Sequence, residues 1–352
     1  MKKILTIALA LLMVLALAAC SSTAPQESEA PKESQAAESK APDTADPEPG
    51  EEETPAEPGG EALTIGFSTK TITNNEFQRI MVVGAQNYVE AAGHTFELTL
   101  AGGEQEVSIQ NNNVEDLINK GVDGIIVIPM DGEAIIPALQ KAQDANIPVV
   151  IGDSSVAEGN EELYITYIGT DNYKVGQEAA SQMIEAVGEG EALLVTGVSG
   201  SVSSEMRSNG FKDGLEGSSV TLANEQSGEW SSEVAMQVTE NMLTSNPDAK
   251  GIFLCSDGML PGVLSAVENA GKTGQITVIS VDGNRSAVEQ IEEGNCYGTV
   301  GQYPEKIGAM CAEYLINAIQ GNLDVNSVEK FIDTGFLFMS ANNLEESYEY
   351  SY

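Results

Sequence analysis

Polar side chains follow the short apolar runs of this sequence, and their types suit a ligand that carries many hydroxyl groups. Asp153 and Ser154 come directly after one run, and Asp282 ends another. A carboxylate accepts two hydroxyl donors at once, whereas the guanidinium of Arg207 presents a rigid fork of donors. Trp230, the only tryptophan, offers a flat ring for the apolar C–H face of a sugar. The pattern therefore predicts a site for a small polyhydroxylated molecule.

Each of these residues also has a purely structural interpretation. An aspartate after a strand is often the cap of the next helix, and we interpret Asp257 in this way. Trp230 could belong to the core. Arg207 could pair at the surface with Glu205 or Asp213, where an ion pair contributes about 0–1 kcal/mol.

The elements that must position these residues alternate regularly along the chain. Short runs rich in Val, Ile and Leu predict strands at 63–67, 95–100, 124–128, 148–151, 192–196, 220–224, 251–254, 277–281 and 297–300. Between them, apolar residues at helical spacing predict helices such as 77–92, 133–145, 173–187, 231–244 and 304–320. Several runs are continuously apolar, which is typical of strands covered by helices on both faces.

Strict alternation of strands and helices predicts parallel sheets with right-handed crossovers. One sheet of this many strands would be unusually large, so we expect two sheets of about five strands. The fold class is therefore α/β, with two similar Rossmann-like lobes. Ligands of such sheets bind beyond the carboxyl ends of the strands, where the polar residues above are found.

The first sixty residues predict that the protein is exported and that a linker tethers its folded part to a membrane. Lys2 and Lys3 precede a short apolar stretch that ends in Leu17-Ala18-Ala19-Cys20, so residues 1–20 are expected to be a lipoprotein signal peptide with Cys20 as the lipidated residue. Residues 21–60 contain seven prolines and eleven acidic residues against two lysines, a composition that predicts a disordered linker. Residues 341–352, acidic and rich in tyrosine, are predicted to be a short solvated tail.

Composition excludes several function classes. A net charge of −38 argues against nucleic acid, whose binders need a basic face. Cys255, Cys296 and Cys311 match no zinc spacing, and we expect them to be small buried apolar residues rather than a disulfide scaffold. Neither a metal nor a cofactor is expected, and the protein is expected to be a monomer.

Five segments in a fixed order resemble the type I periplasmic sugar-binding proteins, especially the ribose-binding proteins of bacterial ABC importers. The segments are Val122-Asp123-Gly124-Ile125-Ile126-Val127, Ala145-Asn146-Ile147-Pro148-Val149-Val150, Ile168-Gly169-Thr170-Asp171-Asn172, Val281-Asp282-Gly283, and Gly301-Gln302-Tyr303-Pro304 with Ile307-Gly308. The resemblance spans residues 63–340. It implies a three-strand hinge between a first lobe of residues 61–167 plus 303–331 and a second lobe of residues 168–302 plus 332–340.

The resemblance also implies a set of ligand contacts. They fall on Asn75, Phe77, Gln78, Ile128, Asp153, Ser154, Arg207, Trp230, Ser256, Val281, Asp282 and Gln302. Asp153, Arg207, Asp282 and Gln302 match the residues of ribose binders. Gln78 and Val281 replace aromatic residues, and Ile128, Ser154 and Ser256 replace Asn, Arg and Asn, so the ligand is expected to differ from ribose in how it is held.

The expected function is capture of a small sugar and its delivery to the permease of an ABC importer, outside the cell membrane and anchored there by lipid. Two alternatives remain: a sensor component that presents its ligand to a chemoreceptor or kinase, and a binder of another small polar ligand such as a nucleoside or an autoinducer. An enzyme is not expected, because the only histidine, His94, precedes a strand and lacks the partners of a catalytic triad. A transcription regulator of this fold would need a DNA-binding segment before residue 61, where the signal peptide and linker stand instead.

Overall fold

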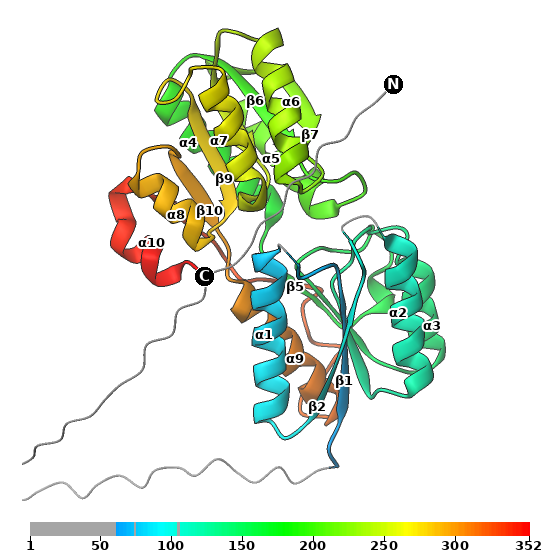
Figure 1. Ribbon diagram of the computed structural model, residues 1–352. Coiled ribbons are helices and arrows are strands. Elements are labelled where there is room, and N and C mark those ends of the chain that lie inside the picture. The colour runs from blue at the N-terminus through cyan, green and yellow to red at the C-terminus, as the bar shows by residue number, and fades with distance from the viewer. Residues whose placement is uncertain (1–60, 74, 104–105) are drawn as a thin grey trace, which may run out of the picture. The chain divides into compact units, whose positions relative to one another are not determined.

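The computed structural model describes residues 61–73, 75–103 and 106–352. The predicted signal peptide, its Cys20 and the predicted linker lie outside these described residues. Within them the chain forms two α/β lobes, each built on a six-stranded sheet (Figure 1).

The first sheet is entirely parallel. Its order is β11 (Phe331–Asp333), β5 (Tyr167–Gly169), β4 (Val149–Gly152), β3 (Gly124–Val127), β1 (Thr64–Thr69) and β2 (Thr95–Leu100). At the centre of this sheet, Ile65 of β1 pairs with Phe96 of β2 on one side and with Gly124 of β3 on the other. Both faces of β3 and β4 are buried, which explains why these strands read as unbroken apolar runs.

Helices cover both faces of the first sheet. One face packs on α1 (Glu76–Ala91) and α9 (Pro304–Ile319), and the other on α2 (Val107–Lys120) and α3 (Ile136–Asp144). A short 3-10 helix, η1 (Glu161–Leu163), follows β4.

The second sheet repeats this arrangement with one antiparallel edge. Its order is β12 (Leu337–Ser340), β10 (Gly298–Gly301), β9 (Thr277–Asp282), β8 (Ala249–Leu254), β6 (Gly190–Thr196) and β7 (Val220–Ser227), and β12 runs antiparallel to β10. Its helices are α4 (Asn172–Val187), α5 (Val202–Leu215), α6 (Ser232–Ser245), α7 (Leu260–Asn269) and α8 (Arg285–Glu292), with η2 (Asp257–Met259) leading into α7. One core cluster runs from α4 and α5 through the strands to α7 and α8.

The chain passes between the two sheets at three places. It leaves the first sheet after β5, returns after β10 and leaves again after β11. Since Ile168, Gly169, Ile332 and Asp333 are strand residues of the first sheet, the first and third crossings lie about two residues later than the predicted lobe boundaries. The crossing segments bind one another: Thr170 Oγ1 lies 3.3 Å from Thr334 Oγ1, and Lys306 Nζ donates to the Thr334 carbonyl at 3.2 Å.

The helices that follow the first and second crossings, α4 and α9, each pack so closely on a neighbouring helix that the two backbones are in contact. A Cβ atom on Gly176 of α4 would lie 2.1 Å from the carbonyl oxygen of Arg207 in α5, and one on Gly308 of α9 would lie 2.0 Å from the carbonyl oxygen of Met81 in α1. Only glycine permits such an approach, so both helices are held tightly onto their lobes.

The predicted solvated tail at 341–352 is wrong. After η3 (Ala341–Asn343) the chain forms α10 (Leu344–Tyr350), which packs on α8 and β12 (Figure 1). Ser347 is fully buried, and Arg285 stacks 4.3 Å from the ring centroid of Tyr348. The acidic residues of this segment face solvent on a helix whose other side is packed, so composition alone gave the wrong expectation.

Candidate functional site

A cleft of about 400 Å³ lies beyond the carboxyl ends of the strands and takes residues from both lobes. Its lining consists of Lys70, Ile72, Asn75, Glu76, Phe77, Gln78, Arg79, Asp153, Ser203, Arg207, Trp230, Ser256, Gly258, Asp282 and Asn284. The predicted ligand contacts are all among them except Ile128, Ser154, Val281 and Gln302. This volume lies within the range of small-molecule sites.

The first lobe presents Asp153 to the cleft through a chain of hydrogen bonds. Asn75 caps α1, its Oδ1 accepting from the backbone N–H of Gln78 at 3.1 Å. Gln78 receives a hydrogen bond from Thr69 Oγ1 and donates through Nε2 to Asp153 Oδ2 at 3.1 Å. Among the described residues, no group donates to the other oxygen, Asp153 Oδ1. That oxygen is therefore open to a ligand hydroxyl.

The backbone at Asp153 has a left-handed conformation, with φ at +59°. Aspartate and asparagine tolerate this region better than most residues. Tyr167 also fixes the loop, because its hydroxyl donates to the Asp153 carbonyl at 2.8 Å. The position of the carboxylate is thus set by the fold before any ligand binds.

In the second lobe, Arg207 is buried and directed at the cleft from α5. Its Nε donates to Asn172 Oδ1 at 2.7 Å, and its Nη1 donates to the Cys255 carbonyl at 2.6 Å and to Asp282 Oδ1 at 3.4 Å. The alternative of a surface ion pair with Glu205 or Asp213 is wrong. No described residue accepts a hydrogen bond from Nη2, so this half of the fork is available to a ligand.

Asp282 is surrounded by protein donors. Its Oδ2 accepts from Ser256 Oγ at 2.6 Å and from the backbone N–H of Asp257 at 3.2 Å. Its Oδ1 accepts from Gln302 Nε2 at 3.0 Å and from Arg207. A carboxylate has about four acceptor positions, and the protein itself fills all four here. Asp282 therefore orients Ser256, Gln302 and Arg207 rather than offering two open oxygens to a ligand.

A second buried carboxylate stands behind Asp282. Asp257 Oδ2 accepts from the backbone N–H groups of Gly283 and Asn284, both at 2.8 Å, and its other oxygen receives bonds from Ser280 and Thr299. The expectation that Asp257 caps the helix after its own strand is wrong: Ser256 is the N-cap of η2, and the Asp257 carboxylate instead holds the turn that begins α8. Burial, with the nearby charge of Asp282 adding to it, raises the pKa of Asp257 to about 7. Burial also raises the pKa of Asp282, against the opposing effect of Arg207.

Trp230 forms a wall of the cleft in a strained turn after β7. Both Glu229 and Trp230 have positive φ, at +55° and +57°. The indole ring lies directly on Gly197, where an added Cβ would come within 2.1 Å of it. Lys70 of the first lobe approaches the ring face, with Nζ 5.9 Å from the centroid. Trp230 is partly buried: it packs against the core of the second lobe and also lines the cleft.

The remaining predicted positions lie behind the lining. Ser154 and Gln302 are buried, and Ile128 and Val281 are fully buried in the cores of their lobes. Gln302 reaches the site only through Asp282. Sequence reasoning missed Lys70, Ile72, Glu76, Arg79, Ser203, Gly258 and Asn284 as lining residues. Lys70 directly follows Ser68 and Thr69 at the end of β1, so the strand-end rule could have found it.

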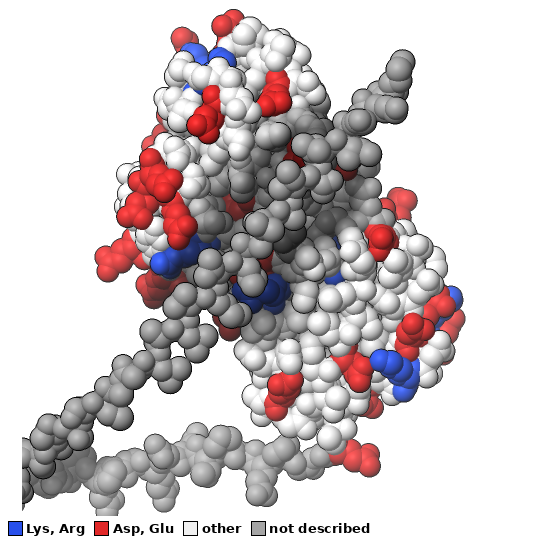
Figure 2. Space-filling model, viewed as in Figure 1, with Lys and Arg blue, Asp and Glu red and all other residues white. Residues whose placement is uncertain are grey.

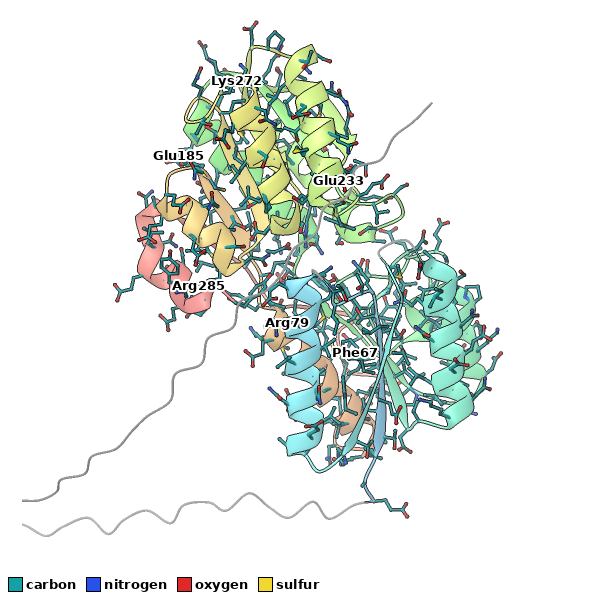
Figure 3. The ribbon with its side chains drawn as sticks, in the orientation of Figure 1. Phe67, Arg79, Glu185, Glu233, Lys272 and Arg285 are labelled. Carbon is teal, nitrogen blue, oxygen red and sulfur yellow. The ribbon has the colours of Figure 1, made fainter. Side chains whose placement is uncertain are left out.

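The charges of the cleft nearly balance. Arg79 pairs with Glu76 in the first turn of α1, and Arg207 pairs with Asp282, which leaves Lys70 and Asp153. On the face shown in Figure 2, most of the charged residues elsewhere are acidic. Arg79 of α1 and Arg285 of α8 lie near the ends of the lobes that meet at the cleft, whereas Phe67 points into the first core (Figure 3). Such a site favours a neutral polar ligand over an anion.

Catalytic or metal chemistry finds no support in the described part of the chain. His94 is tied to the Leu63 backbone N–H and lies next to Gln320, within the first lobe. The described residues contain no cluster of three or more metal-ligating side chains. Cys255, Cys296 and Cys311 are each buried and unpaired. No helix in the described ranges is both long and apolar enough to cross a membrane.

The family model for a periplasmic binding protein domain matches residues 65–323. The chain belongs to the periplasmic binding protein family. The ribose import binding protein of Bacillus subtilis is 32% identical over 260 residues, which cover 74% of this chain and 82% of the relative. The D-allose-binding periplasmic protein of Escherichia coli is 32% identical over 259 residues, covering 71% and 82%.

Solved structures of the family agree with the fold. A solute-binding protein of an ABC transporter from Agrobacterium vitis, crystallised with D-fucose, superimposes with a TM-score of 0.76 at 31% identity, covering 82% of this chain and 100% of the other. One from Actinobacillus succinogenes with bound D-allose gives a TM-score of 0.74 at 30% identity, covering 81% and 99%. The prediction of two α/β lobes of the type I class is therefore confirmed.

Proposed function

We propose that this periplasmic binding protein captures a small neutral sugar in the cleft between its lobes and delivers it to an ABC importer outside the cell membrane. The observation that carries the proposal is the pairing of one open carboxylate oxygen, on Asp153, with one open guanidinium nitrogen, on Arg207. One accepts and the other donates, and they come from different lobes. Trp230 adds a ring face beside them.

The relatives support the sugar class. Three relatives named for ribose or allose are at least 30% identical, and the structures with D-fucose and D-allose show that related proteins bind deoxy and epimeric hexoses. The near-balance of charge in this cleft fits such neutral ligands better than sugar phosphates.

A thermal-shift screen tests this proposal. The panel contains D-ribose, D-allose, D-fucose, D-xylose, myo-inositol and adenosine. A ligand at 100 times its Kd should stabilise the protein by about 2.7 kcal/mol and raise its unfolding temperature. A shift with adenosine alone, or with no sugar of the panel, would contradict a sugar-binding function.

Transport is separated from sensing by an uptake assay. A strain that lacks the protein should fail to import the radiolabelled sugar found in the screen, and the wild-type gene should restore uptake. A gene carrying Asp153→Asn should not. Normal uptake in the deletion strain, together with a lost chemotactic response, would instead identify a sensor.

We also propose that the protein is anchored by lipid on Cys20. The support is the sequence Leu17-Ala18-Ala19-Cys20 after an apolar stretch, since acyl chains add about 0.8 kcal/mol of membrane affinity per buried methylene. Metabolic labelling with radioactive palmitate should mark the wild type and not Cys20→Ser. Labelling of both proteins would place the anchor elsewhere.

A further inference from the structure

Tyr352, the last residue of the sequence, lies against both lobes beside the cleft. Its ring meets the ring of Phe77 edge-on, with centroids 6.1 Å apart, and it packs on the core of the first lobe. Its carbonyl accepts a hydrogen bond from the backbone N–H of Arg285 at 2.9 Å, at the start of α8 in the second lobe. Phe77 lines the cleft, as does Asn284 next to Arg285. Tyr352 is not itself among the lining residues: its ring packs against Phe77 of the first lobe, and its backbone carbonyl binds the start of α8 in the second.

The hydroxyl of Tyr352 is buried, yet it has no hydrogen-bond partner among the described residues. A buried hydroxyl without a partner is costly, since the lost hydrogen bonds to water are not replaced. Two neighbouring acceptors share this condition, Asn284 Oδ1 and Gln302 Oε1. All three belong to residues grouped around Asp282, which Gln302 contacts directly.

The electrostatic surroundings place the phenol among the charged groups of the site. Burial raises the pKa of Tyr352 well above its ordinary value, and the carboxylates of Asp282, Asp257 and Asp153 add to this effect while Arg207 opposes it. Asp153 and Asp282 belong to different lobes, so a group that senses both lies where the cleft closes.

We propose that Tyr352 is a ligand-binding residue, whose hydroxyl pairs with a hydroxyl of the bound sugar and whose ring closes the side of the cleft next to α1 and α8. A hydroxyl both donates and accepts, so it complements the acceptor on Asp153 and the donor on Arg207. The segment predicted to be a solvated tail thus contributes to specificity. This inference rests on the proposed capture of a polyhydroxylated ligand.

Calorimetric titration of the full-length protein tests the inference with D-ribose, D-allose, D-fucose and adenosine as probes. Tyr352→Phe removes only the hydroxyl and should weaken binding about tenfold, which is about 1.4 kcal/mol. Tyr352→Ala also removes the ring and should weaken it further. Tyr350→Phe is the matched control, because Tyr350 is 46% exposed and should bind within twofold of the wild type.

Two results would overturn the inference. Binding of Tyr352→Phe within twofold of the wild type would show that the hydroxyl does not meet the ligand. Tighter binding by Tyr352→Ala would show that the ring blocks the cleft instead. If only adenosine binds, the sugar function fails, whereas the comparison of variants on adenosine still decides the role of Tyr352.

A measurement without ligand tests the location directly. Tetranitromethane nitrates accessible tyrosines, and mass spectrometry of the C-terminal peptide reports Tyr350 and Tyr352 together. We expect Tyr352 to be nitrated at least about tenfold more slowly than Tyr350, because its hydroxyl is buried. Equal nitration rates at Tyr350 and Tyr352 would show that the Tyr352 phenol is not buried beside the cleft. That result would refute the inference even if no probe binds.

Discussion

Replacing Asp153 by asparagine should weaken sugar binding without unfolding the protein. Asparagine can keep the hydrogen bond from Gln78 Nε2 by turning its carbonyl oxygen toward it, and it tolerates the left-handed backbone at φ +59°. Its amide NH₂ group then faces the cleft where Asp153 Oδ1 stood. The mutation thereby puts a donor in place of a carboxylate oxygen that lines the cleft and receives no hydrogen bond from a described residue.

The size of the effect follows from the kind of bond that is lost. A hydrogen bond to a charged group contributes about 1.5–3 kcal/mol, so the Kd should rise about ten- to hundredfold. Calorimetric titration with the sugar found in the screen measures this change. The unfolding temperature should stay within about 1 °C of the wild type, less than the shift of about 1.6 °C that about 1 kcal/mol produces in a folded part of about 290 residues.

Asp123→Asn is the matched control for this experiment. Asp123 precedes β3 at the opposite end of the sheet and accepts from the Thr64 backbone N–H at 2.7 Å, which asparagine can also do. The affinity of the Asp123→Asn variant for the sugar should stay within twofold of the wild type. If Asp153→Asn also binds within threefold, the open carboxylate oxygen does not meet the ligand, and the assignment of the cleft to sugar binding loses its main support.

Three further predictions follow from contacts in the second lobe. Asp282→Ala should weaken binding at least about thirtyfold and also lower the unfolding temperature, because four donors lose their acceptor; affinity or stability equal to the wild type would contradict this. Burial raises the pKa of Asp257 from 3.8 to about 7 on folding, so the stability it contributes in the protonated form is fully present below about pH 4 and is lost by about pH 7. Between about pH 4 and 7 the unfolding temperature should therefore fall less steeply in Asp257→Asn than in the wild type, and parallel slopes would refute this. Gly176→Ala should cost about 1–3 kcal/mol in urea unfolding, because its Cβ would lie 2.1 Å from the Arg207 carbonyl oxygen, whereas Gly258→Ala, whose nearest neighbour would be 3.5 Å away, should cost far less.

The order of strands and helices could be predicted from the sequence because buried strands consist of unbroken apolar runs. Strands such as β3 and β4 are enclosed on both faces, and every residue in them is buried. The sites at strand ends then follow from topology, which is why Asp153, Arg207 and Asp282 were found.

The roles within the site could not be predicted in the same way. Whether an aspartate faces a ligand or the protein depends on how many donors surround it, and the donors of Asp282 come from residues 207, 256, 257 and 302. The two aspartates therefore look alike in sequence and differ in structure. The C-terminal helix was missed for a related reason, since Ser347 and Tyr352 gain their packing only from distant elements.

The glycine contacts of α4 and α9 determine where this protein can bend. Each helix is the first element after a crossing, and each is locked onto its lobe within its first two turns, at Gly176 and Gly308. Neither helix can tilt without separating backbone atoms in direct contact. Any rotation between the lobes would therefore have to be absorbed by dihedral angles in the few residues around 170, 302 and 335. An engineered disulfide between these crossing segments, rather than between the helices, would therefore be expected to stop such a rotation.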